Sequence, residues 1–218
     1  MKAYEPPALT MQEIVTVPWS DDLPSRLDWR IMSHNDFQGN YITSVKNQGQ
    51  CGSCWAFSAV GQVESWWLIE NDRPDTTLDL SEQTLLSGSN ACSCEGGRPG
   101  EALEWIQRNG VPPEWCFEYA AADTIPLDSA YAEWKNYAYT IPGWNYITGD
   151  KAEVNNIKHA LMYHPVSACF EVYTDFNYYL HGIYEPTEIS GSTGTWHAIL
   201  IIGWNDADSC WICKNSWG

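Results

Sequence analysis

The stretch Gln48–Phe57, with the sequence QGQCGSCWAF, decides how this 218-residue chain folds. Glycine and serine residues predict a turn immediately before Cys54, and apolar residues recur at helical spacing after it. The pattern predicts a buried helix that begins at Cys54 and ends near Glu70, before the breaker cluster Asn-Asp-Arg-Pro at 71–74. We expect the rest of the chain to be organised around this helix.

The position of Cys54 at the start of a helix has a chemical consequence. A helix N-terminus carries a partial positive charge and free N–H groups, which favour a thiolate over a thiol. Because a thiolate is a good nucleophile near neutral pH, Cys54 is a candidate nucleophile. The alternative is a buried structural cysteine with no chemical role.

Composition limits the kind of protein and its partners. Apolar residues make up 44% of the chain and 13 residues are Trp, which argues against disorder. Acidic residues outnumber basic ones by 28 to 11, and the net charge of −17 disfavours nucleic acid and anionic membranes as partners. No apolar run reaches the length of a membrane span. Eight cysteines indicate an oxidising compartment or a site that uses several thiols.

The pattern of the chain changes from helical to extended at Pro165. Residues 1–22 contain several prolines and no apolar signal-peptide core, so we expect an extended lead-in there. The order of the elements predicts an α+β protein with two lobes rather than repeating βαβ units. Besides the helix at Cys54, we expect helices at 80–86, at 101–108 and from a capping box at 150–153 to before Pro165, and strands at 166–172, 183–185, 196–204 and 210–215.

A cysteine nucleophile needs a base, and the base needs a group that orients it. Of the five histidines, His197 is the best candidate because it starts the most hydrophobic strand of the chain, where a polar ring needs a partner. Asn215 ends the next strand. Two strands joined by a short turn pair antiparallel, which can set Asn215 beside His197. The spacing from Cys54 to His197 is 197 − 54 = 143 residues.

With these residues, the chain resembles the papain family of cysteine peptidases, in which the spacing from the catalytic cysteine to the histidine falls in the same range as that from Cys54 to His197. The resemblance covers roughly residues 23–218. It implies a two-lobed fold with a helical lobe at about 23–140, an antiparallel, barrel-like β lobe at about 141–218 and a cleft between them. Residues 1–22 are then a lead-in or propeptide remnant. The motifs that carry it, in the order of the family, are QGQCGSCWAF at 48–57, LSEQ at 80–83, CEGG at 94–97, WHA at 196–198 and KNSWG at 214–218.

The resemblance implies a role for each matching catalytic position. Cys54 is the nucleophile, and His197 is its partner in a thiolate–imidazolium pair. Asn215 orients His197, and Trp217 covers the hydrogen bond between them from water. The Gln48 side-chain amide and the Cys54 backbone N–H form the oxyanion hole, which is worth roughly 3–4 kcal/mol per donor in comparable sites.

Substrate contacts are also implied by the resemblance. Gly96 and Gly97 would offer bare backbone for a substrate strand to pair with. The pocket for the residue two places before the scissile bond would be lined by Arg98, Pro99, Cys169 and Thr195. Arg98 is unusual in that position, which suggests tolerance for acidic or polar side chains; the alternative is that Arg98 points to solvent.

The cysteines outside the catalytic position have structural interpretations. By resemblance, Cys51 bridges to Cys94 and so holds the substrate-binding loop against the helix. A second bond between Cys92 and Cys116 is a hypothesis, since the usual partner cysteine is absent. The remaining three, Cys169, Cys210 and Cys213, are interpreted as small buried hydrophobes. A zinc site that combines the pairs 92/94 and 210/213 lacks a matching loop geometry, so we expect no metal and no cofactor.

These observations predict a cysteine-type endopeptidase that cleaves peptide bonds through an acyl-enzyme on Cys54. The alternative is a catalytically silent papain-fold module for peptide binding or adhesion. We expect a monomer that acts on a peptide or protein substrate, with no nucleic-acid partner and no membrane insertion. We also expect a secreted or otherwise extracytoplasmic protein whose signal and prosegment lie outside this sequence, and a β lobe that lacks its last strands after Gly218.

Overall fold

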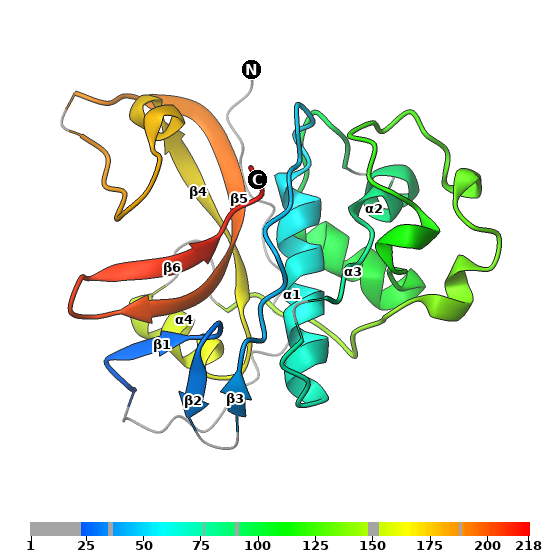
Figure 1. Cartoon of the computed structure of the whole chain (residues 1–218). Coiled ribbons are helices and arrows are strands. Elements are labelled where there is room, and N and C mark those ends of the chain that lie inside the picture. The colour runs from blue at the N-terminus through cyan, green and yellow to red at the C-terminus, as the bar shows by residue number, and fades with distance from the viewer. Residues whose placement is uncertain (1–22, 35–36, 76, 90–91, 148–152, 188) are drawn as a thin grey trace.

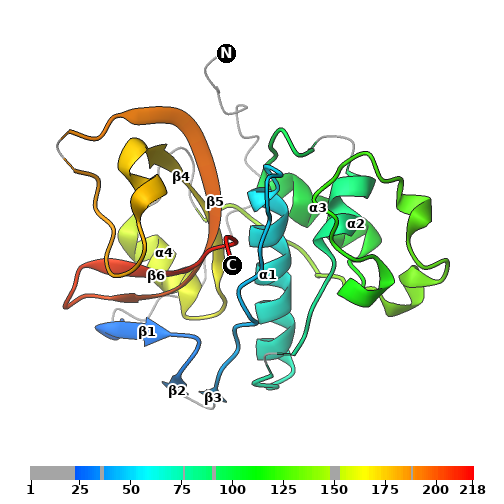
Figure 2. The same ribbon diagram turned by 45° about the horizontal axis from the view of Figure 1, so that its top comes forward.

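The structure is a computed structural model, and it describes residues 23–34, 37–75, 77–89, 92–147, 153–187 and 189–218. Helix α1 (Cys54–Glu70) stands between a lobe of short helices and a lobe built on a β-sheet, as two views of the chain show (Figures 1 and 2). The other elements are α2 (Glu82–Gly88), α3 (Pro99–Asn109), α4 (Val154–Leu161), the 3₁₀ helices η1 (Glu114–Cys116), η2 (Leu127–Ser129), η3 (Trp134–Tyr137) and η4 (Thr174–Tyr178), and the strands β1 (Arg26–Asp28), β2 (Met32–His34), β3 (Phe37–Gly39), β4 (Val166–Tyr173), β5 (Ser192–Asn205) and β6 (Cys210–Lys214).

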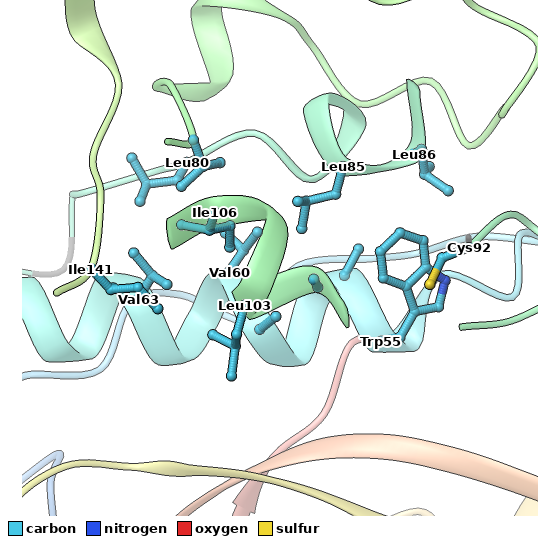
Figure 3. Packing of buried hydrophobic residues seen from close by; sticks show 14 of the residues in the cluster. Trp55, Val60, Val63, Leu80, Leu85, Leu86, Cys92, Leu103, Ile106 and Ile141 are labelled. Carbon is cyan, nitrogen blue, oxygen red and sulfur yellow. The ribbon is translucent and has the colours of Figure 1, made fainter. Parts of the chain in front are cut away.

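Helix α1 begins and ends where the sequence predicts. It is buried nearly all round, because both lobes pack on it. Its first half packs with α2 and α3 around Trp55, Val60 and Leu103 (Figure 3). On the opposite side, the Ser58 hydroxyl donates to the carbonyl of Ile199 in β5 over 2.7 Å. The helix is therefore the shared wall of the two lobes.

The predicted helices of the first lobe are also present. Helix α2 is capped by Ser81, whose hydroxyl oxygen accepts a hydrogen bond from the Thr84 N–H over 3.2 Å. Helix α3 ends at Gly110, which adopts φ +77°, a backbone conformation that glycine tolerates best. Of the predicted capping box at 150–153, residues 150–152 lie outside the described part of the chain; α4 begins directly after Glu153.

The sheet is organised on β5, which is long enough to pair with every other strand of it. Strands β4, β1 and β6 all lie antiparallel to β5. The register pairs Cys169 with Ala198 and Phe170 with His197. On the other side of β5, the register pairs Leu200 with Lys214, the residue before Asn215. This brings the end of β6 toward the start of β5, as the sequence predicts.

The structure differs from the expectations in three respects. The sheet does not close into a barrel: four paired strands are too few to curl round and leave no edges. Residues 183–185 are not a strand, because the segment between η4 and β5 is irregular. Finally, β1 pairs with β5, and nearby Trp29 donates from its indole N–H to the Leu161 carbonyl over 2.8 Å, so the start of the expected helical lobe packs with the β lobe.

A buried cluster of charges, here called the interlobe cluster, joins the lobes behind α1. It consists of Lys46, Glu64, Glu82 and Lys214, with Thr43. Lys46 Nζ lies 3.1 Å from Glu64 and 2.9 Å from Glu82. Burial raises the pKa of Glu82 to about 8, although the positive charge of Lys46 opposes that rise. Although burial alone would lower it, the two carboxylates raise the pKa of Lys46.

Candidate active site

The proposed catalytic residues come from four places in the chain and meet where α1 begins. Cys54 is the first residue of α1, and Gln48 lies in the segment that leads to it. His197 lies in β5, and Asn215 follows β6 directly. The backbone of the Gln48 segment is fixed to the other lobe, because the Gln48 N–H donates to the carbonyl of Ser216 over 2.8 Å.

His197 is held in one tautomer by its neighbours. The ring is buried, and its Nε2 lies 2.7 Å from Asn215 Oδ1. The same amide oxygen accepts the N–H of Ser216 over 2.8 Å, which fits an oxygen and not a nitrogen at that position. Since Oδ1 can only accept, Nε2 must carry the proton, and Nδ1 of the neutral ring is left as the acceptor. The predicted orienting contact is therefore present in the structure.

Aromatic rings shield this hydrogen bond. The Trp217 ring centroid lies 4.8 Å from that of His197, and Phe170 lies 5.7 Å away, nearly perpendicular. Phe176 contacts the other rings from η4. Trp217 was predicted from the sequence, whereas the two phenylalanines were not. The register of β4 against β5 identifies Phe170, since it pairs with His197, but that register was not predictable from the pattern of either strand.

The Cys54 thiol lies at the contact between α1 and β5. Burial raises its pKa, while hydrogen bonds from the backbone N–H groups of Ala198, Trp55 and Cys54 itself partly offset that rise. The predicted effect of the helix N-terminus is thus present, but burial outweighs it. Burial likewise lowers the pKa of His197, against the opposing effect of its hydrogen bond to Asn215. Neither the Cys54 thiolate nor the His197 imidazolium is favoured alone, so each charge would depend on the other for stabilisation.

The Gln48 side chain is fixed by two hydrogen bonds. Its Nε2 donates to the Cys51 carbonyl over 2.9 Å, and its Oε1 accepts the Ser216 hydroxyl over 2.6 Å. An amide nitrogen has two hydrogens, so one N–H remains for a ligand. Tyr119 was not predicted from the sequence; its hydroxyl donates to the Gln48 carbonyl over 2.8 Å and lies 2.6 Å from the Ser53 hydroxyl. No motif marks a tyrosine so far along the chain.

The predicted disulfide between Cys51 and Cys94 is present, and it closes a separation of 43 residues. Beside it, the Gly52 N–H donates to the Cys94 carbonyl over 2.8 Å. The loop at 94–97 therefore lies directly against the turn before α1. A Cβ atom at Gly97 would come within 2.8 Å of the Trp55 ring, so only glycine allows this approach.

The hypothesised bond between Cys92 and Cys116 is wrong, because both thiols are free. Cys92 packs in the core beside α1, and its thiol donates to Glu101 Oε2 over 2.9 Å. Cys116 belongs to a separate cluster around Trp134.

The interpretation of Cys169 and Cys213 as buried is also wrong, since both are exposed. Because Cys94 is in a disulfide, it is not available for the zinc site that the sequence analysis set aside.

The other expected subsite residues lie at the edges of the two lobes. Pro99 is the first residue of α3, and the Arg98 guanidinium before it lies 3.9 Å from Glu101. In β5, the Thr195 side chain is exposed and its hydroxyl lies 2.5 Å from that of Thr193. Their grouping in one pocket stays a prediction.

In the part of the chain that the structure describes, no group of three or more histidine, cysteine or acidic side chains could hold a metal ion. Within the same residues, none of the helices combines the length and the apolar character needed to cross a membrane.

Curated proteins of known activity have sequences similar to that of this chain. Pro-cathepsin H of Mus musculus is 34% identical over 208 residues, which cover 89% of this chain and 56% of that protein. A cathepsin L-like proteinase of Fasciola hepatica is 32% identical over 203 residues, or 90% of this chain and 57% of that protein. The chain thus spans just over half the length of these curated relatives.

Solved structures show the same fold. A cysteine protease of Carica candamarcensis in complex with E-64 aligns with a TM-score of 0.69 and 26% identity, over 90% of this chain and 84% of that one. The bromelain protease of Ananas comosus, also with E64, aligns with a TM-score of 0.66 and 30% identity, over the same shares. Residues 23–218 match the family described as papain family cysteine protease, and the chain belongs to that family.

Proposed function

We propose that this chain is a cysteine endopeptidase in which Cys54 attacks the peptide carbonyl. The observation that carries the proposal is the hydrogen bond from His197 Nε2 to Asn215, because it leaves Nδ1 free to take the thiol proton. The thiol stands beside the N–H of Ala198, the residue that follows His197. Proton transfer would create two charges in a buried place, and their mutual attraction offsets the desolvation of each.

The reaction would then follow two displacements at one carbonyl carbon. The Cys54 thiolate attacks the carbon, and the imidazolium of His197 donates its proton to the leaving amine, which gives a thioester on Cys54. A water molecule, deprotonated by His197, attacks the thioester and releases the acid product. Throughout, Asn215 holds the ring, and Trp217 keeps water from the hydrogen bond between them.

The oxyanion hole would be formed by Gln48 and by the backbone N–H of Cys54. The Gln48 amide keeps one N–H for a ligand, and its other two hydrogen-bonding contacts fix its direction. The Cys54 N–H belongs to the first turn of α1, where backbone N–H groups have no carbonyl partner within the helix. Donors that are fixed before the reaction stabilise the developing oxyanion without having to reorient.

For the substrate, we propose an extended peptide that pairs with the backbone of Gly96 and Gly97. No atom lies within 4 Å of a Cβ built at Gly96, so the loop is open on that side. Arg98, Pro99, Cys169 and Thr195 would line the pocket for the residue two places before the cleaved bond. The Arg98 guanidinium lies 3.9 Å from Glu101, and we propose that an acidic substrate residue would compete with this carboxylate for its charge.

Covalent labelling of Cys54 tests the proposal directly. The purified chain is treated with E-64, an epoxide, and then digested and mapped by mass. We expect modification of Cys54, and cleavage of a peptide that is blocked at both ends, which an exopeptidase would leave intact. Both activities should be lost in Cys54→Ser and kept in Cys210→Ser, a matched removal of a thiol in β6. A folded protein with unreactive Cys54 would favour the alternative, a peptide-binding or adhesion module.

Partners and location belong to the same proposal. We propose a monomer that acts on peptides or proteins outside the cytoplasm. The disulfide between Cys51 and Cys94 supports this location, because such bonds persist in oxidising compartments. The net charge of −17 gives no support to nucleic acid as a partner.

A further inference from the structure

A second thiol lies beside Cys54, and the proposed mechanism does not use it. Cys169 is in β4, is exposed and forms no disulfide. The contacts of a neighbouring residue in β4 show in which direction the Cys169 side chain points. The Ser167 hydroxyl donates to the Ser58 carbonyl of α1 over 3.1 Å, so the side chain of Ser167 faces α1. Alternate residues of a strand share a face, so Cys169 faces α1 as well.

The direction of β4 carries Cys169 toward the first turn of α1. Contacts between α1 and β5 show that the two elements run in the same direction. Cys54, at the start of α1, contacts Ala198, and Gly61, further along the helix, lies next to Leu200, further along the strand. Strand β5 therefore runs with the helix, and β4, which is antiparallel to β5, runs against it. From the contact between Ser167 and Ser58, the chain advances about 7 Å to Cys169 along β4. A similar step of about 6 Å leads back along α1 to Cys54.

The register gives the same position independently. Cys169 is directly opposite Ala198, and the N–H of Ala198 contacts the Cys54 sulfur. Residues opposite one another in antiparallel strands lie about 4.5–5.5 Å apart, so Cys169 is one strand spacing from the residue whose N–H contacts the Cys54 sulfur. Although the residue is exposed, the protein atoms that surround its sulfur, and then the negative charge of Cys54, raise the pKa of the Cys169 thiol to about 11. The two sulfurs therefore interact electrostatically.

We propose that Cys169 is a resolving cysteine that captures oxidised Cys54 as a reversible disulfide. The inference rests on the proposed role of Cys54 as a nucleophilic thiolate. Hydrogen peroxide, the oxidant, transfers one oxygen to the Cys54 sulfur, which gives a sulfenic acid and one water after protonation. The Cys169 sulfur then attacks the Cys54 sulfur, the S–O bond breaks, and the hydroxyl leaves as water with the thiol proton. The cysteines lose two hydrogens, and the peroxide is reduced to two waters.

The electrostatics of the pair gives the two thiols different reactivity. Desolvation and, after it, the charge of the Cys54 thiolate raise the pKa of Cys169, so Cys169 stays protonated while Cys54 reacts with peroxide. Once Cys54 is a neutral sulfenic acid, the contribution of its charge is gone, and His197 can accept the proton of Cys169. The disulfide protects Cys54 from further oxidation to the sulfinic acid, which thiols do not reduce.

Peroxide treatment of the folded chain tests the inference. The wild-type chain is oxidised, and activity is measured before and after dithiothreitol, while non-reduced digests are mapped by mass. We expect a peptide pair linked through Cys54 and Cys169, and recovery of activity. In Cys169→Ala, recovery relative to the same variant before peroxide should fall roughly tenfold, with sulfinic acid at Cys54. Cys213→Ala, which removes another exposed thiol of the sheet, should recover like wild type.

The outcomes separate this inference from the proposed function. If Cys54 of the wild type becomes a sulfinic acid and no linked peptide is found, the resolving role of Cys169 is overturned, while the proposed role of Cys54 as nucleophile stands. Cys54 that reacts with neither peroxide nor E-64 overturns both. Because the linked peptide is sought in the wild-type chain, the test does not depend on whether Cys169→Ala folds.

Discussion

Single atoms decide the chemistry at the scale of the residue. Asn215 Oδ1 accepts two hydrogen bonds, one from His197 and one from the Ser216 backbone. The Ser216 hydroxyl in turn orients the amide of Gln48. The orienter of the base and the proposed oxyanion donor are therefore positioned by one residue between them. A displacement of Ser216 would disturb both.

Replacement of Asn215 by alanine should lower kcat/KM roughly 10- to 100-fold, or about 1.4–2.7 kcal/mol of transition-state stabilisation. The ring loses the contact that fixes its tautomer. The hydrogen bond that His197 donates to Asn215 also raises the pKa of His197, so its loss should move the alkaline limb of the pH profile to lower pH. The measurement is kcat/KM as a function of pH. Asn205→Ala, at the far end of β5, is the control, and an unchanged Asn215→Ala profile would refute the positioning role.

Replacement of Gly97 by alanine should cost about 1–3 kcal/mol of unfolding free energy, because the new Cβ would lie 2.7 Å from Cys92 Sγ and 2.8 Å from the Trp55 ring. Gly191→Ala is the matched control, since no atom lies within 4 Å of its Cβ position. Urea denaturation of both variants measures the difference. Equal stabilities would show that the loop is not packed as described.

At the scale of the element, the loop at 94–97 and the first turn of α1 form one covalently linked unit. Removal of the bond by Cys51→Ala with Cys94→Ala should lower the unfolding free energy by about 3–4 kcal/mol on chain-entropy grounds, given the separation of 43 residues. It should also raise KM, because Gly96 and Gly97 would no longer be held beside Cys54. Denaturation without reductant and steady-state kinetics measure the two effects.

The control for this pair is the double variant Cys210→Ala with Cys213→Ala, which also removes two cysteines but breaks no bond. We expect its KM to match that of the wild type. If the variant that lacks Cys51 and Cys94 were as stable as this control, the disulfide would not stabilise the fold as described.

Elements with strong local signals were predictable from the sequence, and those set by distant contacts were not. The helix from Cys54 to Glu70 has a turn before it and a breaker after it, and both bounds were correct. His197 and Asn215 were found because a short turn fixes how β5 and β6 pair. By contrast, the pairing of β1 with β5 joins segments that lie far apart in the chain.

The failed disulfide shows the same limit at a single side chain. Cys92 was paired with Cys116 as a substitute for the cysteine that the family usually has and this chain lacks, but Glu101 in the first turn of α3 already serves as the partner of its thiol. Sequence gives the number of cysteines and not the direction of each sulfur. The resolving position proposed for Cys169 was equally hidden, because it follows from the register of β4.

At the scale of the whole molecule, the interlobe cluster links α1 to α2 and β6. Lys214 Nζ donates to the Thr43 hydroxyl over 2.7 Å and lies 3.7 Å from one carboxylate oxygen of Glu64, while Lys46 Nζ lies 3.1 Å from the other. A small cavity among these charges is also lined by Asn215 and Ser216. The cluster therefore lies directly behind the proposed active site.

The protonation of Glu82 should make stability depend on pH in a defined direction. Its pKa is about 8 in the folded chain against an ordinary value of 4.5, so the folded state binds more protons between these values. Its contribution to stability is then complete below pH 4.5 and is lost as the pH rises through 8. Lys46 stays charged throughout, because its own pKa is raised.

The variant Glu82→Gln lacks this titration and keeps the shape of the side chain. We expect the wild-type advantage in unfolding free energy to decrease steadily from pH 5 to pH 8, with a slope of up to about one proton. Chemical denaturation at several pH values measures it. Glu95→Gln, in the loop at 94–97, is the control and should show no such trend. A difference between wild type and Glu82→Gln that does not vary with pH would refute the raised pKa.

The interlobe cluster also bears on how fast the molecule opens. When two lobes begin to separate, buried charges lose their partners before water can fully replace them, so the barrier to opening is higher than the final stability implies. The lifetime of the closed form is then governed by this barrier. For the proposed peptidase among copies of itself, a long lifetime means that few chains are open to cleavage at any moment. These buried charges would thus delay self-digestion.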